Sequence, residues 1–259
     1  MPPSLPRISR RTLLLGAPGG FALHRYFSPP AVSAQAVIEN APLPVRDPAN
    51  YTAYIPTASK TGPFFIYTCE FDAAWAVLKT FGIDSTLDDQ LAAITIDRRI
   101  EPYYEWRPDG VFIYGGDITY GGDITTSYSG DYTWNYLCRT TGDGFRPVFE
   151  HYGLKASRVN SRDRIERYLQ RGRLIWIKTT VDFKDWTPAT WVTPEGKRLQ
   201  VVLTNDHAMV VIGYNNDVVV IRDVLGPTDT NWQRPYEFEV PWSRFLACWE
   251  ANGAVGWPA

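Results

Sequence analysis

An apolar helix pattern that begins at Cys69 places the strongest constraint on how this chain folds. From Cys69 to Phe81 the apolar residues recur at the i, i+3, i+4, i+7 spacing of a single helix face, and Gly82 supplies a C-terminal stop. Thr68 is the expected N-cap, and Glu70 lies in the first turn. A helix with one apolar face needs a partner surface to bury that face. The face consists of Phe71, Ala74, Trp75 and Leu78.

Strands later in the chain are expected to supply the partner surface. His207 to Tyr214 and Val218 to Asp223 have the pattern of two strands joined by a turn at 215–217. Helices therefore come first and strands later, which favours an α+β fold. Further helices are expected at 86–94, within 133–152, at 162–170 and at 242–249, with a strand at 174–177.

The first 36 residues have the composition of an export signal. The segment 9–15 resembles a twin-arginine motif, and small residues allow cleavage after Ala34 or Ala36. The apolar run is too short for a transmembrane helix, and the alternative interpretation is a disordered basic tail. We expect an exported protein that is extracellular, periplasmic or on the cell surface. A linker or extended arm is expected over 37–60, and one domain over 61–259.

The composition argues against several partners and cofactors. The formal net charge is −2, so no basic field indicates nucleic acid or an anionic membrane. No metal or other cofactor is expected, because His207 and Asp223 lack a third ligand at suitable spacing. The three cysteines allow either a bridge between Cys138 and Cys248 or three reduced thiols.

Residues 97–133 have the composition of a loop that contains a tandem repeat. Tyr-Gly-Gly-Asp-Ile-Thr at 114–119 occurs again at 120–125. Two copies are too few for a calcium-binding β-helix, so a duplicated loop is favoured. We interpret this segment as a flap over a site.

Cys69, His207 and Asp223 are the candidate catalytic residues. In a nucleophilic cysteine site a base activates the thiol and an acid orients the base. A helix start lowers the pKa of a thiol, whereas the carboxylates of Glu70 and Asp72 oppose this effect. A three-residue turn at 215–217 brings the acid diagonal to the imidazole, roughly 7–8 Å apart and within side-chain reach.

Each of the three residues also has an ordinary structural interpretation. A cysteine at a helix start is commonly a small buried residue, and a histidine at a strand end commonly binds the backbone. Asp223 can simply cap a turn. The other histidines have no comparable setting, because His24 lies in the expected signal and His151 has no acid at strand spacing.

Three blocks of sequence carry a resemblance to a known family. They are Thr-Cys-Glu-Phe-Asp-Ala-Ala at 68–74 with Phe-Gly at 81–82, Asp-His-Ala-Met-Val-Val-Ile-Gly-Tyr at 206–214, and Val-Ile-Arg-Asp at 220–223. Together they resemble the bacterial papain-like cysteine peptidases related to the double-glycine, bacteriocin-processing type. The segment 242–249 is similar to the closing helix of that family. The resemblance covers about residues 61–250.

The resemblance implies a papain-like α+β fold with N-terminal helices packed on an antiparallel sheet. It also implies a thiol hydrolase that cuts peptide or amide bonds in a peptide or protein substrate, such as one of the cell envelope. Cys69 would be the nucleophile, His207 the base and Asp223 the orienting acid.

The chain departs from the family pattern around the expected nucleophile and acid. Glu70 and Phe71 replace Gly-Pro after the cysteine, and Val224 replaces Pro after the acid. Pro63 stands where papain-like enzymes have the Gln that helps to stabilise the oxyanion. The remaining oxyanion candidates are Tyr67, Asn50 and the backbone N–H of Cys69.

These departures keep two other functions open. One is an inactive papain-like domain that binds peptide or glycan in an aromatic groove, which ten Trp and fifteen Tyr would allow. The other is a thiol amidase or transferase on the same fold, which the order of Cys and His does not distinguish.

Overall fold

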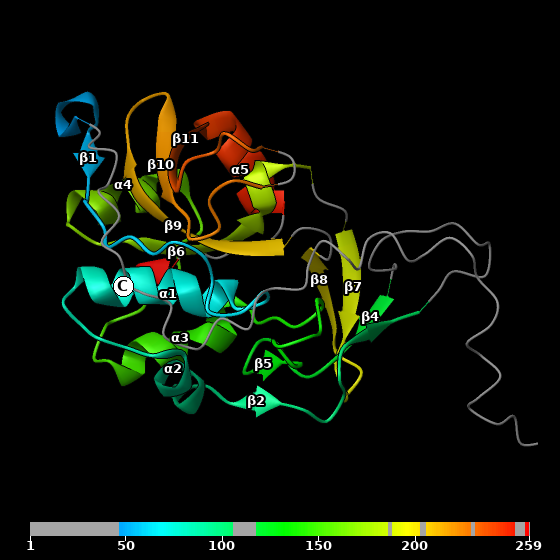
Figure 1. Ribbon diagram of the computed structural model, residues 1–259. Helices are drawn as coiled ribbons and strands as arrows, with labels where there is room; N and C mark the ends of the chain where they lie inside the picture. The colour runs from blue at the N-terminus through cyan, green and yellow to red at the C-terminus, as the bar shows by residue number, and fades with distance from the viewer. Residues whose placement is uncertain are drawn as a thin grey trace, which may run out of the picture. The chain divides into compact units, whose positions relative to one another are not determined.

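An antiparallel sheet forms the centre of the fold in this computed structural model (Figure 1). Its strands follow the order β11-β10-β9-β6-β12, and β1 pairs with the end of β9. The structure describes residues 47–105, 118–185, 188–202, 206–228, 231–251 and 257–258, so the expected signal at 1–36 lies outside it. The strands are β1 (Ala53–Tyr54), β6 (Ile175–Thr180), β9 (Asp206–Tyr214), β10 (Val218–Arg222), β11 (Glu237–Pro241) and β12 (Trp257–Pro258).

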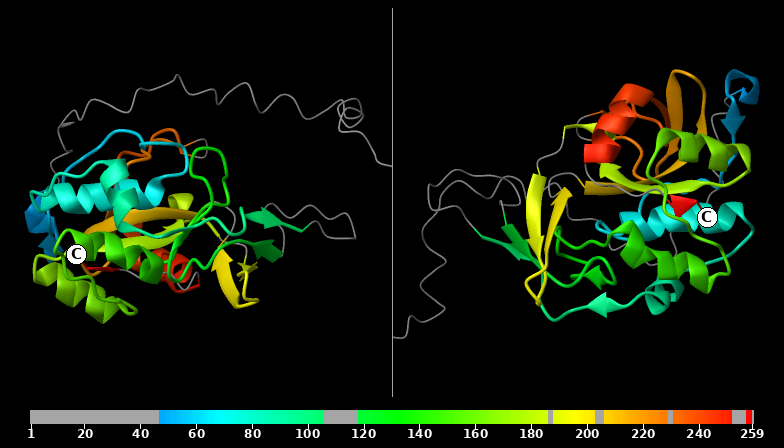
Figure 2. Two further views of the ribbon diagram at one scale, coloured as in Figure 1. Left: turned by 90° about the horizontal axis from the view of Figure 1, so that it is seen from below. Right: turned by 180° about the vertical axis from the view of Figure 1, so that it is seen from behind.

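Helices cover both faces of this sheet (Figures 1 and 2). Alternate residues of β9 point to opposite faces, so Ala208 and Val210 pack against α1 and α3, whereas Met209 and Val211 pack against α4 and α5. The α+β fold with N-terminal helices on an antiparallel sheet is therefore confirmed. The helices are α1 (Cys69–Thr80), α2 (Leu87–Ala93), α3 (Gly142–His151), α4 (Arg162–Gln170) and α5 (Trp242–Ala251), with short 3-10 turns at Pro48–Asn50 and Val181–Phe183.

Helix α1 begins at Cys69, as the sequence predicts, but Thr68 does not cap it with its side chain. The Thr68 hydroxyl is instead 2.8 Å from the carbonyl oxygen of Phe65 and 2.7 Å from Asp72 Oδ2. Asp72 Oδ1 lies 2.6 Å from Lys60 Nζ. Burial raises the pKa of Asp72 to about 6, and Lys60 opposes that rise. These contacts fix the segment 60–68 against the first turn of the helix.

The shorter helices begin at the polar residues that precede them. Ser161 caps α4, and its hydroxyl accepts a hydrogen bond from the backbone N–H of Arg164. Thr86 and Asp89 form a complete capping box at the start of α2. No helix in the described part of the chain is long and apolar enough to cross a membrane.

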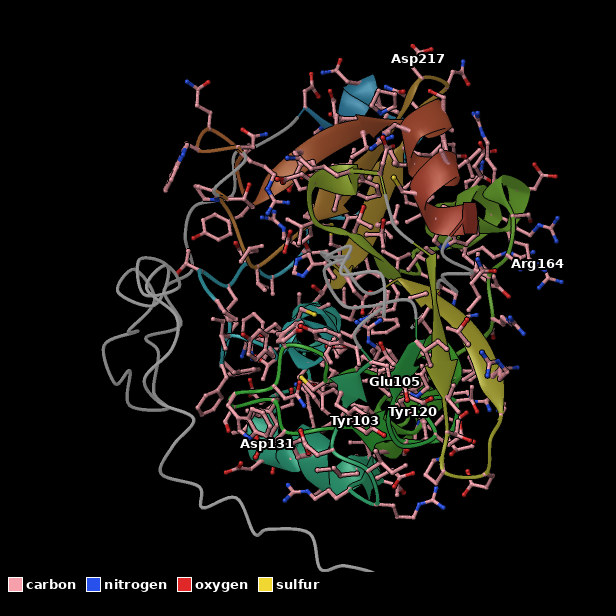
Figure 3. All side chains as sticks on the ribbon, turned by 90° about the vertical axis from the view of Figure 1, so that its right-hand side faces the viewer. Tyr103, Glu105, Tyr120, Asp131, Arg164 and Asp217 are labelled. Atoms are coloured by element: carbon pink, nitrogen blue, oxygen red, sulfur yellow. The ribbon has the colours of Figure 1, made fainter. Side chains whose placement is uncertain are left out.

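The segment predicted as a loop at 97–133 contains short strands instead, which pair with one another and with later residues. Strand β2 (Ile96–Asp97) pairs in parallel with β5 (Tyr128–Ser129). A second sheet has the order β3-β4-β7-β8, and in it Tyr103 stacks on Tyr120 with ring centroids 5.1 Å apart, next to Glu105 (Figure 3). Its strands are β3 (Tyr103–Tyr104), β4 (Ile118–Tyr120), β7 (Pro188–Val192) and β8 (Arg198–Val202).

The second copy of the repeat, at 120–125, is packed into this small sheet and is not a free flap. The indole N–H of Trp191 donates to the carbonyl oxygen of Gly122 at 2.9 Å. A Cβ added at Gly121 would lie 2.0 Å from the Trp191 ring, so only glycine fits there. Most of the first copy, at 114–117, lies outside the described residues.

The turn between β9 and β10 contains residues 215–217, as the sequence predicts, but the strand pairing beside it is shifted by one residue. Tyr214 pairs with Val219 and not with Val218. A hydrogen bond from the N–H of Asn215 to the carbonyl oxygen of Val218, at 3.0 Å, closes the turn. The predicted pairing of Tyr214 with Val218 is therefore wrong.

A β-bulge restores the predicted register farther along the two strands. The ladder shifts between Val220 and Ile221 because Ile212 is an extra residue on β9. Beyond the bulge Arg222 pairs with Val210, which leaves Asp223 diagonal to His207. Without the extra residue Asp223 would face the opposite side of the sheet.

The three cysteines are reduced, so the suggested bridge between Cys138 and Cys248 does not form. Cys138 belongs to the core on the α1 side of the main sheet, and Cys248 belongs to the core on the α5 side. The sheet separates the two sulfur atoms. Each thiol has a local partner, because Cys138 accepts from Tyr128 at 2.9 Å and Cys248 donates to the Phe183 carbonyl at 3.1 Å.

Candidate active site

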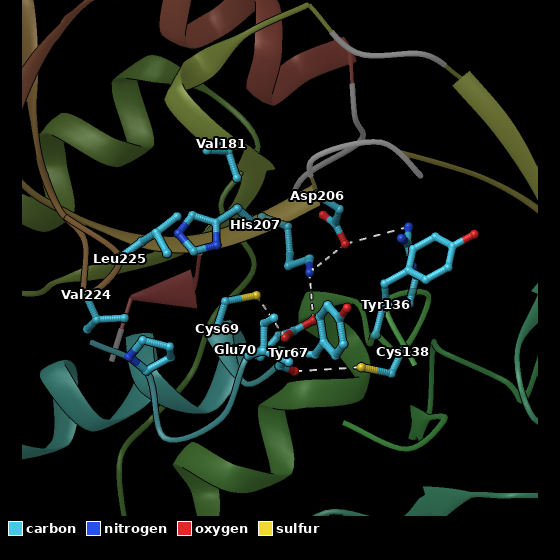
Figure 4. Close-up of a pocket in the computed structure, with 14 residues that line it drawn as sticks. Tyr67, Cys69, Glu70, Tyr136, Cys138, Val181, Asp206, His207, Val224 and Leu225 are labelled. Atoms are coloured by element: carbon cyan, nitrogen blue, oxygen red, sulfur yellow. Dashed lines mark hydrogen bonds and ion pairs between the residues drawn. The ribbon is translucent and has the colours of Figure 1, made fainter. Parts of the chain in front are cut away.

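A pocket of about 240 Å³ lies between the start of α1 and the neighbouring ends of β6 and β9 (Figure 4). Cys69 and His207 both line it. In Figure 4 Val224 and Leu225 lie on one side of these two residues, and Glu70 and Asp206 lie on the other. The pocket thus has an apolar wall and a charged wall, with the sulfur and the imidazole between them. None of the described residues from 97–133 lines it.

His207 and Asp223 meet in a buried hydrogen bond. His207 Nε2 lies 2.9 Å from Asp223 Oδ1, and both side chains are almost fully buried. Burial raises the pKa of Asp223, but His207 and Arg234 outweigh burial and hold that pKa below its usual value. An ionised Asp223 makes Nε2 the donor. Nδ1 is then the ring nitrogen that can accept a proton from a thiol.

Arg234 bonds to Asp223 on the side away from His207, and no motif in the sequence marks Arg234. Its Nη1 lies 2.9 Å from Asp223 Oδ2, and its Nε lies 3.0 Å from Asp182 Oδ1. Both Nε and Nη2 donate to the carbonyl oxygen of Gly226, at 2.9 Å and 2.7 Å. The N–H of Leu225 donates to Asp223 Oδ1 at 2.9 Å. These hydrogen bonds and the ion pair with Asp182 therefore fix the loop that carries the acid.

The Cys69 thiol is turned toward Glu70. Cys69 is half-buried at the first position of α1, and its Sγ donates to Glu70 Oε2 at 3.2 Å. In Figure 4 the His207 ring lies above the Cys69 side chain, while the sulfur points to the carboxylate. Burial and then Glu70 raise the pKa of the thiol, and Lys178 opposes them. The lowering expected from the helix start is outweighed.

A row of alternating charges forms the charged wall. Lys178 Nζ lies 2.7 Å from Glu70 Oε1 and 2.8 Å from Asp206 Oδ2. Arg139 Nη1 continues the row at 3.6 Å from Asp206 Oδ2. Glu70 is 1% exposed, so its charge depends on Lys178 for compensation. The position of Glu70 in the sequence already marks it as a charge that opposes the lowering of the thiol pKa. No local pattern marks Lys178, because strand pairing alone brings it here.

Among the oxyanion candidates, Tyr67 lines the pocket together with Pro63. Asn50 is a wrong prediction, because its carbonyl oxygen accepts from Asn215 at the far turn between β9 and β10. The backbone N–H of Cys69 lies at the first helical position, where no intrahelical acceptor exists.

The remaining sequence candidates lie elsewhere. His151 is exposed at the end of α3, with its ring against Tyr152. Within the described ranges, no group of three His, Cys, Asp or Glu side chains is arranged to hold a metal ion.

Comparison with known proteins now identifies the family. The model of the peptidase C39-like family matches residues 50–256. The chain belongs to the peptidase C39-like family. A solved structure described as a C39-like peptidase from Bacillus anthracis superimposes with a TM-score of 0.55 and 18% sequence identity, covering 80% of this chain and 96% of the other. That likeness supports the fold. No match was found among curated proteins.

The family match also bears on the N-terminal arm. It begins at residue 50, within the segment expected as a linker or extended arm. There Ala53 and Tyr54 pair with β9, and Thr57 accepts a hydrogen bond from Arg222 at 3.1 Å. This part of the arm is therefore bound to the sheet of the C39-like domain.

Proposed function

We propose that this C39-like protein is an exported cysteine hydrolase that cleaves peptide or amide bonds through Cys69, His207 and Asp223. The observation that carries the proposal is the buried hydrogen bond between His207 Nε2 and Asp223 Oδ1 at the pocket that also contains Cys69. That bond gives the imidazole the tautomer a base needs. Export rests on the twin-arginine-like segment at 9–15.

The proposed reaction follows the usual chemistry of a thiol nucleophile. His207 Nδ1 takes the proton of the Cys69 thiol, and the thiolate attacks the substrate carbonyl carbon. The oxygen of the tetrahedral intermediate accepts a hydrogen bond from the backbone N–H of Cys69. His207 then protonates the leaving amine, and the acyl–sulfur bond is broken by water that His207 deprotonates.

The thiol rotamer supports a second function, an inactive domain that binds peptide or glycan. Cys69 donates to Glu70 at 3.2 Å, and Pro63 occupies the place of the oxyanion Gln. The first observation does not suit a resting thiolate, and the second removes a donor that would stabilise the oxyanion. In this second function Cys69→Ala binds the same peptides as the wild type, and neither protein cleaves them.

The test combines alkylation with cleavage. The wild type and His207→Ala are treated with iodoacetamide at neutral pH, and modification of Cys69 is followed by peptide mass mapping. Both are also incubated with a library of internally quenched peptides. Because general base catalysis contributes about 10²–10⁴-fold, His207→Ala should lose at least about 10² in cleavage rate and should also alkylate more slowly.

His151→Ala is the matched control, because His151 is exposed and distant from the pocket. It should behave like the wild type in both assays. The proposal is overturned if His207→Ala and the wild type alkylate at the same rate and no peptide is cleaved.

A further inference from the structure

A charged pair that the proposed reaction does not use lies against the nucleophile. Glu70 Oε2 accepts from the thiol at 3.2 Å, and Glu70 Oε1 contacts Lys178 Nζ at 2.7 Å. The Trp176 indole N–H also donates to the backbone oxygen of Glu70 at 3.1 Å. Both carboxylate oxygens are thus occupied, and the side chain is 1% exposed. The carboxylate is therefore held in one position next to the sulfur.

We propose that Glu70 is a positioning residue that holds the Cys69 thiol protonated and directed away from His207, and that Lys178 sets the strength of this hold. The effect of the Cys69–Glu70 hydrogen bond on catalysis rests on the proposed function. The hydrogen bond itself does not depend on that function. The thiol becomes available to Nδ1 when the sulfur leaves Glu70 by rotation about its Cα–Cβ bond.

Lys178 forms ion pairs with two carboxylates, so its single positive charge cannot fully neutralise Glu70. Its Nζ lies 2.8 Å from Asp206 Oδ2 as well as 2.7 Å from Glu70 Oε1. Asp206 is 12% exposed and is therefore closer to solvent than Glu70. A substrate that contacts Asp206 would change how strongly Lys178 compensates the negative charge of Glu70. The charged wall thus links pocket occupancy to the state of the thiol.

Several elements around the thiol contribute charged or titratable groups to this balance. Helix α1 contributes Glu70, β6 contributes Lys178, and β9 contributes Asp206 and His207. The segment after β5 contributes Arg139 through its contact with Asp206. Cys138 and Tyr67 line the same pocket. Among the carboxylates, only Glu70 bonds directly to Sγ within the described residues.

The experiment measures the pH midpoint of iodoacetamide alkylation at Cys69 in the full-length wild type and in Glu70→Gln. The variant keeps the shape of the side chain and an acceptor oxygen but removes the charge. We expect its midpoint to fall by at least about one pH unit, which is a tenfold gain in thiolate fraction below the midpoint. Because a less basic thiolate is a weaker nucleophile, the rate at pH 7 should rise by only about threefold.

Asp72→Asn is the matched control. Asp72 is also a buried acid in the first turn of α1, but it bonds to Lys60 and Thr68. Its substitution should leave the alkylation midpoint within about 0.3 units of the wild type, because its charge is compensated away from the sulfur. An equal shift in Asp72→Asn and Glu70→Gln would overturn the proposal, since any loss of charge from the helix would then suffice.

Asp206→Asn keeps the proposal testable if Glu70→Gln does not fold. It removes the competitor for Lys178 at a more exposed position, and it should lower the midpoint in the same direction by a smaller amount. An unchanged midpoint in Glu70→Gln would overturn the proposal, and if Glu70→Gln does not fold, an unchanged midpoint in Asp206→Asn would overturn it. Cleavage is measured separately: a shifted midpoint in a protein that cleaves no peptide supports the Glu70 contact and counts against the proposed function alone.

Discussion

Replacing Arg234 gives the sharpest test of how the acid of the site is held. Arg234 is 2% exposed and lies between two buried carboxylates, those of Asp223 and Asp182. We consider Arg234→Met, which keeps most of the side-chain length but removes the charge and the donors. The carbonyl oxygen of Gly226 would lose two hydrogen bonds at the same time.

The magnitude follows from the burial of these partners. Removing one member of a buried ion pair typically costs about 3–5 kcal/mol, because the remaining charge has no compensation. Asp223 is 0% exposed, so it cannot recover that loss from water. The free energy of unfolding at pH 7 should therefore fall by about 3–5 kcal/mol in Arg234→Met.

The loss should also depend on pH. His207 and Arg234 hold the pKa of Asp223 below its usual value against the effect of burial, so an ionised Asp223 stabilises the fold above that usual value. This stability is lost as the pH falls through the folded-state pKa. Without Arg234 the folded-state pKa rises toward its usual value, so the loss of stability on acidification should be smaller in Arg234→Met than in the wild type.

Urea unfolding followed by tryptophan fluorescence measures both effects, and Arg244→Met is the matched control. Arg244 also pairs with an aspartate, Asp185, but the two side chains are 39% and 96% exposed. An exposed pair contributes at most about 1 kcal/mol. If Arg234→Met destabilises the protein no more than Arg244→Met, the ion pair between Arg234 and Asp223 does not stabilise the fold, and the prediction is refuted.

Two further predictions concern the small sheets. Gly121→Ala should lower the free energy of unfolding by about 1–3 kcal/mol, measured by urea unfolding, because its Cβ would lie 2.0 Å from the Trp191 ring; an unchanged stability would contradict this packing. Arg99 hydrogen bonds hold the pKa of Asp97 well below its usual range against burial, so Asp97 stabilises the fold above its usual pKa and this stability is lost as the pH falls. Acid unfolding of Asp97→Asn should therefore be less steep than that of the wild type, and identical acid profiles would refute this role.

Local signals in the sequence determined the elements that follow short-range rules. Helix α1 begins at Cys69 because an apolar face of period 3.6 starts there, and α4 begins after Ser161 because that hydroxyl caps it. The antiparallel hairpin of β9 and β10 follows from two alternating strands around a polar turn. Such patterns depend on neighbours within a few residues, so they can be read along the chain.

Other features depend on residues that are distant in sequence, and only the tertiary structure decided them. The pairing of Tyr214 with Val219 and the bulge at Ile212 together leave Asp223 diagonal to His207, although the predicted pairing of Tyr214 with Val218 was wrong. At the bulge, the N–H of Ile55, the residue after β1, donates to the carbonyl oxygen of Ile212, and that contact has no local signal.

The amino-acid sequence was sufficient to identify the candidate residues Cys69, His207 and Asp223 and the family-like order in which they occur. The tertiary structure decided what surrounds them. Lys178 reaches Glu70 across 108 positions of sequence, and Arg234 reaches Asp223 from the end of a loop. Charge interactions act through space and depend on burial, so the direction of the thiol and the ionisation of the acid are set by residues that no local pattern marks.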